Sequence, residues 1–323
     1  MSLSISRTMK SFSANLSSSS FILIGIPGLE DFHVWIAIPV FFMYLITFLV
    51  NVGLLLIIKR SKRLHQPMYL LLCMLLLVDL IKCNSTLPKM ILLFWFNLRE
   101  ISFEGCLLQM FFTHCSSVMV SSILLAMAFD RYVAVCQPLR YSTILTNTRI
   151  AKIGLLVVMR GFLMIFPHPF LVRRLLFCRS HVIQHTYCEH IAVAKLSCAS
   201  IKINIIYGLT AALLVIGVDA VCIAVSYAMI IIAVFRLQSR EARHKVGSTC
   251  VTHACVILLS YLPALFSFIS QRFGGHKATS TQIILSNLYL ILPPMLNPII
   301  YGMMSKEIQR NIQKLFCPQK VKY

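Results

Sequence analysis

The chain has 323 residues, of which 58% are hydrophobic and only 12% are charged. A soluble domain of this size cannot bury so much apolar surface, so the composition excludes a soluble protein and favours one embedded in a lipid bilayer. The net charge of +20 does not indicate nucleic acid, because the basic residues lie in short clusters between apolar runs rather than in one patch.

The first 32 residues are expected to lie outside the membrane. The first 20 are polar and rich in serine, and the short apolar run Phe21–Ile26 ends at Pro27-Gly28, so no cleavable signal peptide is expected. Insertion then depends on the first membrane-spanning helix. Asn15-Leu16-Ser17 matches the acceptor pattern for N-glycosylation, which operates only in the lumen and requires an N-terminus outside the cell.

Seven stretches are long and apolar enough to cross a bilayer, which takes about 20 mainly apolar residues. They cover residues 33–58, 67–95, 104–132, 149–167, 204–235, 246–270 and 281–303. The predicted fold is an all-α membrane protein in which residues 33–303 form a seven-transmembrane helix bundle.

Basic residues indicate which ends of the helices face the cytoplasm. Most of them lie after the first, third and fifth helices and in the C-terminal tail, whereas half of those on the opposite side belong to one long loop, residues 168–204. Short loops rich in Lys and Arg stay in the cytoplasm. We therefore expect a plasma-membrane protein with its N-terminus outside the cell.

Residues 304–323 are expected to form a short amphipathic eighth helix and a cytoplasmic tail. Ile308, Ile312, Leu315 and Phe316 recur at helical spacing with basic residues between them, which is typical of a helix lying on the inner leaflet against membrane lipid. Cys317 stands where a palmitoyl anchor would be attached.

Three motifs, in order along the chain, carry a family resemblance. The third helix ends in MAFDRYVAVC over Met127–Cys136, the sixth opens with KVGSTCVTH over Lys245–His253, and the seventh ends in PPMLNPIIYG over Pro293–Gly302. With Pro67-Met68-Tyr69 and Asp79 in the second helix, they resemble the olfactory receptors, a branch of the rhodopsin-like G-protein-coupled receptors. The resemblance covers nearly the whole chain.

Four further features resemble the class I, or fish-like, olfactory receptors. They are Ile26-Pro27-Gly28-Leu29-Glu30, Tyr187-Cys188-Glu189-His190, Asp219 in the fifth helix and Arg272-Phe273-Gly274. The resemblance implies a receptor for small, polar or carboxylic-acid-bearing odorants that couples to a stimulatory G protein, raises cyclic AMP and is not an enzyme.

The resemblance also implies which residues transmit activation. Arg131 would part from Asp130, and the sixth helix would swing outward at its cytoplasmic end, in a helix bundle with two states. Pro263 gives that helix a local reason to bend, although a purely structural kink is an equal alternative. The residues assigned to coupling are Asp130, Arg131, Tyr132, Tyr227, His253, Asn297, Pro298 and Tyr301.

Two acids lie inside predicted helices, where a charge is costly and usually has a partner. The resemblance places Asp79 with Asn51 and Asn297 around a sodium ion or a proton, and the alternative is a neutral, hydrogen-bonded Asp. Val120 departs from the family, which usually has an acidic residue there, so the ion site is uncertain. Asp219 is either a proton-linked switch or a structural contact between helices. No other cofactor or metal is expected.

Four cysteines lie on the predicted outer side, where disulfides persist. The resemblance implies the pairs Cys106 with Cys188 and Cys178 with Cys198. Such bridges would hold the loop 168–204 over the mouth of the bundle as a lid, which suits a receptor for small ligands better than an open channel.

The receptor family binds its ligands beneath such a lid, among the third, fifth, sixth and seventh helices. Most of the corresponding side chains are apolar, which fits volatile molecules held by buried area with one or two polar anchors. The implied ligand-binding residues are His114, Cys115, Val118, Tyr207, Ala211, Ala212, Leu265, Phe268 and Arg272. Arg272 either binds the carboxylate of an acidic odorant or extends to the lipid headgroups.

Three alternatives remain. A transporter or channel would leave the motifs around Arg131 and Pro298 unexplained. A membrane enzyme is disfavoured because the sequence has no HExxH, no GxSxG, no paired catalytic carboxylates and no Gly-rich phosphate loop. The third is a receptor-shaped protein that no longer signals, which Val120 and the unusual order Asn51-Val52-Gly53 would suit.

Overall fold

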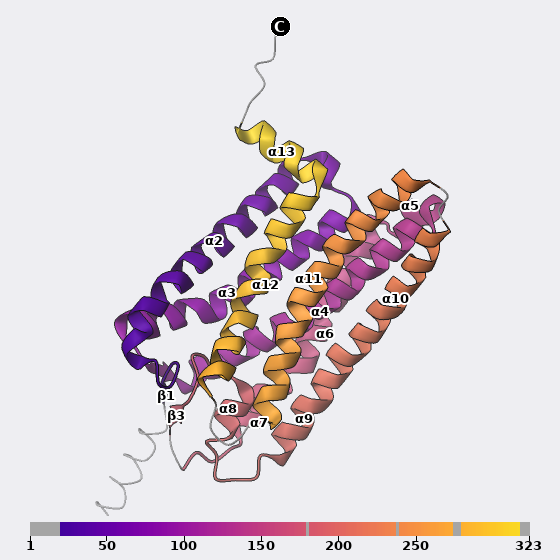
Figure 1. Ribbon diagram of the computed structural model, residues 1–323. Helices are drawn as coiled ribbons and strands as arrows, with labels where there is room; N and C mark the ends of the chain where they lie inside the picture. The colour runs from indigo at the N-terminus through magenta and orange to yellow at the C-terminus, as the bar shows by residue number, and fades with distance from the viewer. Residues whose placement is uncertain (1–19, 179–180, 237–238, 274–278, 317–323) are drawn as a thin grey trace, which may run out of the picture.

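The computed structural model describes residues 20–178, 181–236, 239–273 and 279–316. Within them, seven helical segments are long and apolar enough to cross a membrane, which confirms the predicted bundle (Figure 1). The helices are α2 (His33–Arg60), α3 (Pro67–Phe96), α4 (Phe103–Cys136), α6 (Asn147–Ile165) with α7 (Pro167–Arg173), α9 (Lys202–Ala212) with η4 (Leu213–Gly217) and α10 (Val218–Phe235), α11 (Arg240–Phe273) and α12 (Ser280–Met304).

The helices extend beyond the predicted spans at several ends. α4 continues to Cys136 and α11 already begins at Arg240, because charged and polar residues continue a helix into water where the apolar run has stopped. The fourth span divides at Phe166, after which Pro167 occupies the first position of α7, where its missing N–H costs nothing.

Helix α13 (Lys306–Phe316) follows α12 and turns away from its axis, as predicted for the eighth helix (Figure 1). Its Ile308 is fully buried and joins a core cluster with Ile58 and Tyr301. Cys317 lies outside the described residues, as does Asn15. The remaining short elements are η1 (Glu30–Phe32), η2 (Lys62–Leu64), η3 (Pro138–Arg140) and α5 (Tyr141–Ile144).

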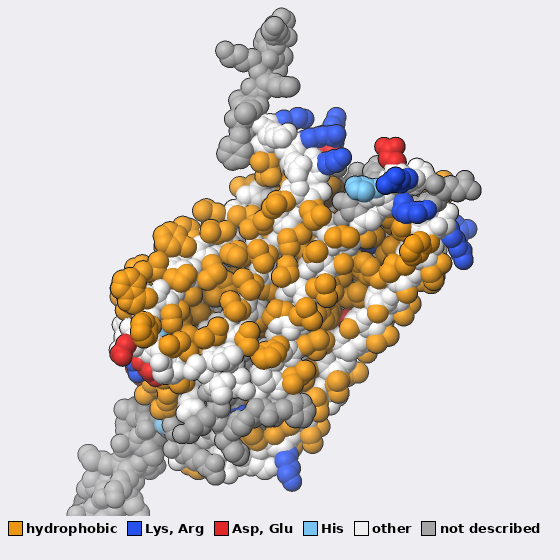
Figure 2. Space-filling model, viewed as in Figure 1, with side chains coloured by type: hydrophobic (Ala, Val, Ile, Leu, Met, Phe, Trp, Pro, Cys, Tyr) orange, Lys and Arg blue, Asp and Glu red, His pale blue; other side chains and the backbone are white. Residues whose placement is uncertain are grey.

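The outer surface matches a bilayer. Figure 2 shows hydrophobic side chains along the length of the helices and Lys and Arg gathered mainly at the end that carries α13. Large apolar side chains such as Trp35, Leu163 and Ile206 are more than 60% exposed. In water this surface would be unfavourable, whereas in lipid it is solvated by acyl chains.

At the other end, a layer that we call the lid closes the bundle. It contains a small sheet, β2-β1-β3, in which β1 (Ser20–Leu23) pairs antiparallel with β2 (Glu100–Ser102) and parallel with β3 (Val182–Ile183), and the short helix α8 (His190–Ala194). The sheet was not predicted, because three strands of two to four residues carry almost no periodic pattern.

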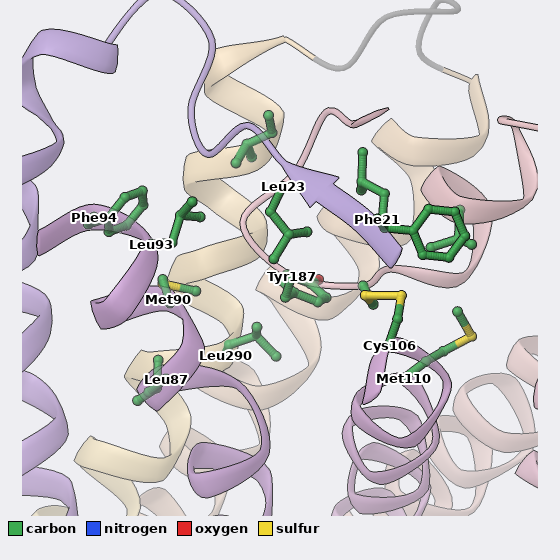
Figure 3. Close-up of a cluster of buried hydrophobic side chains, with 14 of the residues drawn as sticks. Phe21, Leu23, Leu87, Met90, Leu93, Phe94, Cys106, Met110, Tyr187 and Leu290 are labelled. Carbon is green, nitrogen blue, oxygen red and sulfur yellow. A yellow bond between two sulfur atoms is a disulfide. The ribbon is translucent and has the colours of Figure 1, made fainter. Parts of the chain in front are cut away.

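Covalent bonds and apolar packing fix the lid to the helices. Cys106 at the start of α4 is bonded to Cys188, and Cys178 to Cys198, which are the pairs that the resemblance implies. Phe21 and Leu23 of β1 point into a buried cluster with Met90 of α3 and Leu290 of α12 (Figure 3). The lid is therefore part of the core rather than a loose loop.

The turn after β1 depends on two glycines with positive φ, +91° at Gly25 and +77° at Gly28. A Cβ on Gly25 would lie 2.5 Å from the ring of His33, whose Nε2 accepts the N–H of Ile26 (3.2 Å). A Cβ on Gly28 would meet nothing within 4 Å.

Both Gly25→Ala and Gly28→Ala should destabilise the protein, but to different degrees. Gly28→Ala carries only the left-handed backbone cost of roughly 1–2 kcal/mol. Gly25→Ala adds a steric clash worth about 1–3 kcal/mol and displaces His33. Thermal unfolding of the purified protein should therefore rank wild type above Gly28→Ala above Gly25→Ala. Equal midpoints for the two variants would contradict the packing of His33 against this turn.

His185 lies in the lid, fully enclosed, with its ring edge-on to Tyr187 at 4.3 Å. The N–H of Thr186 donates to its Nδ1 (3.0 Å), which requires that nitrogen to be unprotonated. Burial lowers the pKa of His185 from 6.5 to about 3. The folded lid therefore holds a neutral imidazole, whereas an unfolded lid would bind a proton below pH 6.5.

Acid should loosen the lid, because only the unfolded form gains a proton between pH 6.5 and 3. Stability is complete above pH 6.5 and falls by about 1.4 kcal/mol per pH unit below it. The unfolding temperature of His185→Gln should consequently drop less between pH 7.5 and pH 5 than that of wild type. The exposed His65→Gln serves as the control, and an identical drop in all three proteins would refute the prediction.

Candidate functional site

A cavity of about 170 Å³ lies within the bundle beneath the lid. This is far above the roughly 10–15 Å³ that one ordered water needs, so a small organic molecule can fit. Tyr187, Glu189, His190 and Ile191 of the lid line its outer end. The Glu189 carboxylate also accepts the N–H of Ala192 (2.7 Å) and so begins helix α8.

Five of the predicted ligand-binding residues line this cavity: His114, Val118, Ala211, Ala212 and Phe268. Most come from α4 and the α9–η4 segment. Their apolar surface suits a hydrophobic ligand, and His114 offers a polar atom, because its buried Nε2 has no hydrogen-bond partner among the described residues.

Three other predicted residues do not line the cavity. Leu265 is 38% exposed on the outer face of α11 and so faces lipid. The Tyr207 hydroxyl donates to the carbonyl of Met164 (2.9 Å), and Cys115 is buried against Val118, Ile165 and Val215. Sequence position alone could not set the rotation of these helices. Arg272 is in the last turn of α11, and its side chain is outside the described part of the structure.

The cavity also contains a lysine that sequence analysis missed. Lys82, in the middle of α3, is only 3% exposed, and its ammonium lies 3.8 Å from the ring centre of Tyr289 on α12. A desolvated cation–π contact contributes about 2 kcal/mol, whereas burying an ion costs several kcal/mol. A lysine inside an apolar run was the signal that could have revealed it.

Below the cavity, an ion pair joins two helices within the membrane. Arg160 of α6 binds Asp219 of α10 at 2.9 Å and also donates to Ser122 (2.8 Å). Asp219 accepts from Ser121 (2.6 Å), whose oxygen lies 2.7 Å from the hydroxyl of Tyr261. Asp219 is therefore a structural contact between helices, one of the two alternatives for it. Arg160, its partner, was not recognised from the sequence.

A π-helical turn, η4, stands directly before Asp219 and occupies Leu213–Gly217. Such a turn adds a residue to the helix and rotates the following side chains. It places Val215 and Ile216 on the cavity wall, while the carbonyl of Leu214 accepts from Arg160 (3.4 Å). The local distortion thus serves both the cavity and the ion pair.

Asp79, at the inner end of the cavity, accepts from the amide of Asn297 (2.9 Å). Asn51 instead donates to the carbonyls of Thr47 and Pro294 (2.7 and 2.9 Å), so it ties α2 to α12 rather than to Asp79. The amide oxygens of Asn51 and Asn297 are buried with no partner in the described part of the chain and are of the type that binds sodium, but Val120 adds only an apolar side chain. No group of three metal-binding side chains occurs among the described residues.

At the end opposite the lid, Asp130 is completely buried and holds two partners. Arg131 binds one carboxylate oxygen at 2.5 Å, and the hydroxyl of Tyr141 donates to the other at 2.8 Å. Burial, together with the nearby Asp130 charge, raises the pKa of Tyr141 above its usual value, so this hydroxyl stays protonated as a donor. Arg131 is thus withdrawn from the surface into an internal pair.

The other predicted coupling residues surround this pair. The Tyr227 hydroxyl of α10 lies 2.8 Å from Nδ1 of His253 on α11, and Tyr301 of α12 reaches the sulfur of Met127 on α4 at 3.9 Å. Pro298 is buried within α12. Tyr132 packs against the apolar core cluster of this end. These side chains meet from four different helices, so a shift of one helix would change several contacts.

The chain matches known proteins over almost its full length. The sequence model of the olfactory receptor family matches residues 40–319. Human olfactory receptor 52P1 is 54% identical over 92% of this chain and 93% of its own length, and human olfactory receptor 52N4 is 50% identical over 95% and 96%. Human olfactory receptor 52D1 is 51% identical over 92% and 93%.

Olfactory receptors are G-protein-coupled receptors for odorants rather than enzymes, and they generally need no cofactor. The seven apolar helices, the family match and the relatives all agree. The chain belongs to the olfactory receptor family, in its class I branch, and is a multi-pass protein of the plasma membrane.

Proposed function

We propose that this receptor binds small, carboxylic-acid-bearing odorants in the cavity beneath the lid and activates a stimulatory G protein, which raises cyclic AMP. The observation that carries the proposal is the cavity itself. The cavity combines apolar walls, including Val118, Ala211 and Phe268, with a few polar groups. One helix, α11, runs from the cavity to the coupling end, by which we mean the end opposite the lid that holds Arg131. The distribution of basic residues puts the lid outside the cell.

Helix α11 supplies the physical link between ligand and G protein. It contributes Phe268 and Tyr261 to the cavity and His253 to the contact with Tyr227 near Arg131. A ligand that presses on the first two side chains favours a position of α11 in which the Tyr227–His253 contact breaks. The ligand shifts the population by its difference in affinity for the two positions.

A sodium ion at Asp79 is the second part of the proposal, and it would favour the state in which Arg131 is paired. Its support is an acid, Asp79, together with the buried amide oxygens of Asn51 and Asn297, for which the described residues offer no partner. Val120 removes the ligand that an acidic side chain would supply. We therefore expect weak, millimolar sodium dependence at most, and no other cofactor.

Cells that express the receptor with an olfactory-type stimulatory G protein should raise cyclic AMP in response to some straight-chain acids. Alcohols and aldehydes of equal length should act more weakly, because a charge-assisted hydrogen bond adds about 1.5–3 kcal/mol. Arg131→Ala should abolish every response at equal surface expression. Silence of the wild type at normal surface expression, across the full set of acids, would support a receptor that no longer signals.

Tyr141→Phe and Asp130→Asn should change signalling in opposite directions. Asp130→Asn removes the charge that holds Arg131 and should raise basal cyclic AMP. Tyr141→Phe leaves Arg131 as the remaining described partner of a buried carboxylate, so releasing Arg131 costs about 1.5–3 kcal/mol more. Basal cyclic AMP should then fall, and the response should shift to a ligand concentration higher by roughly tenfold to a hundredfold. A rise in both variants would overturn this role for Tyr141.

A further inference from the structure

Lys82 is the unexplained charge of the cavity. It lies in α3 within the predicted span 67–95, its side chain is buried, and it lines the cavity wall. None of the ion pairs between described residues includes it, and no hydrogen bond from its ammonium is found there. A buried ammonium that lies over an aromatic ring and has no ion pair or hydrogen bond to a described residue is far from fully compensated, and an anion would stabilise it.

The nearest acid along the chain, Asp79, compensates the Lys82 charge only in part. Asp79 stands one helical turn away on the same face of α3, close enough for the two charges to act on each other, but no ion pair within 4.0 Å joins these two described residues. The Asp79 carboxylate accepts from Asn297 instead. Lys82 instead extends over the Tyr289 ring, on the side of the cavity formed by α3, α4 and α12.

The surroundings of Lys82 are held firmly, as a binding site requires. Tyr289 is fixed because its hydroxyl donates to Ser117 of α4 (2.8 Å), and α3 meets α4 through Ser85 and Thr113 (3.4 Å). Beside Thr113, His114 has its buried Nε2 free for one more hydrogen bond. A cation, two hydroxyls and an imidazole thus border one end of an otherwise apolar cavity.

We propose that Lys82 binds the anionic head group of the receptor's ligand, an aliphatic carboxylate whose tail lies along Val118, Ala211 and Val215. This inference rests on the proposed function of the cavity and places the acid between α3, α4 and α12, deep in the bundle. It replaces Arg272, at the lid end of α11, as the anchor of the acid. Selectivity for acids over alcohols then comes from the mutual neutralisation of two desolvated charges.

The test measures the thermal stabilisation of the purified receptor in nanodiscs by sodium hexanoate, methyl hexanoate and 1-hexanol. Wild type should respond to hexanoate at the lowest concentration. Lys82→Met should raise the hexanoate concentration for half-maximal stabilisation by roughly tenfold to a hundredfold, and should leave the ester and the alcohol unchanged. Lys82→Arg should retain most of the preference for the acid.

Two matched variants complete the design. Lys202→Met makes the same change at an exposed lysine that does not line the cavity, and it should behave as wild type. Arg272→Ala should keep the response to hexanoate. The proposal is overturned if Arg272→Ala alone loses that response, or if Lys82→Met weakens hexanol as much as hexanoate.

If Lys82→Met does not fold, the thermal stabilisation of the wild type by different ligands still tests the proposal. Equal stabilisation by hexanoate and methyl hexanoate would overturn the proposal, as would stabilisation by sodium chloride or acetate that matches that by hexanoate. Because the readout involves no G protein, a receptor that binds hexanoate through Lys82 without raising cyclic AMP would refute the proposed signalling and retain this site. If Lys82→Met still raises cyclic AMP in response to hexanoate, the site at Lys82 is refuted and the proposed signalling is retained.

Discussion

The bundle depends on one constraint, which is that lipid tails are as apolar as the helix surfaces they touch. Burial of apolar side chains therefore gives little attraction between helices inside the membrane, and polar contacts take a larger part. The structure shows where they act. Asn51 joins α2 to α12, Asn297 joins α12 to Asp79 on α3, and Arg160 joins α6 to Asp219 on α10. At the lid, by contrast, disulfides and a buried cluster of apolar side chains, as in a soluble protein, hold the segments together.

Because polar contacts join the helices within the membrane, the polar side chains lie along the inside of the bundle. The polar residues that link the helices also form the floor of the cavity, since Ser121 and Tyr261 both line it and belong to the Asp219 network. A ligand bound in this cavity, as proposed, would therefore touch the contacts that hold α4, α10 and α11 together. Nine residues further along α4 lies the ion pair of Asp130 and Arg131, which the proposed activation would break.

The sequence predicted the number and position of the spanning helices and the eighth helix, because a continuous apolar run and a 3.6-residue period are local signals. It did not predict the β1–β3 sheet or the division of the fourth span at Phe166, which depend on packing at the membrane boundary. Within the site, the order of motifs located Asp130 and His114. The rotation of each helix, which turned Leu265 outward and Lys82 inward, is a tertiary property that no local pattern encodes.

Several buried polar side-chain atoms have no hydrogen-bond partner among the described residues, and their positions bear on the proposed signalling. The oxygens of Asn51 and Asn297 and Nε2 of His253 lie between the cavity and the coupling end. Each unsatisfied atom costs roughly 1–3 kcal/mol. Under the proposed signalling, a second arrangement of α11 and α12 that satisfied these atoms, with water or with each other, would recover that free energy and offset the loss of the Arg131–Asp130 and Tyr227–His253 contacts. Two packings with compensating polar contacts differ little in free energy, and a small ligand then suffices to choose between them.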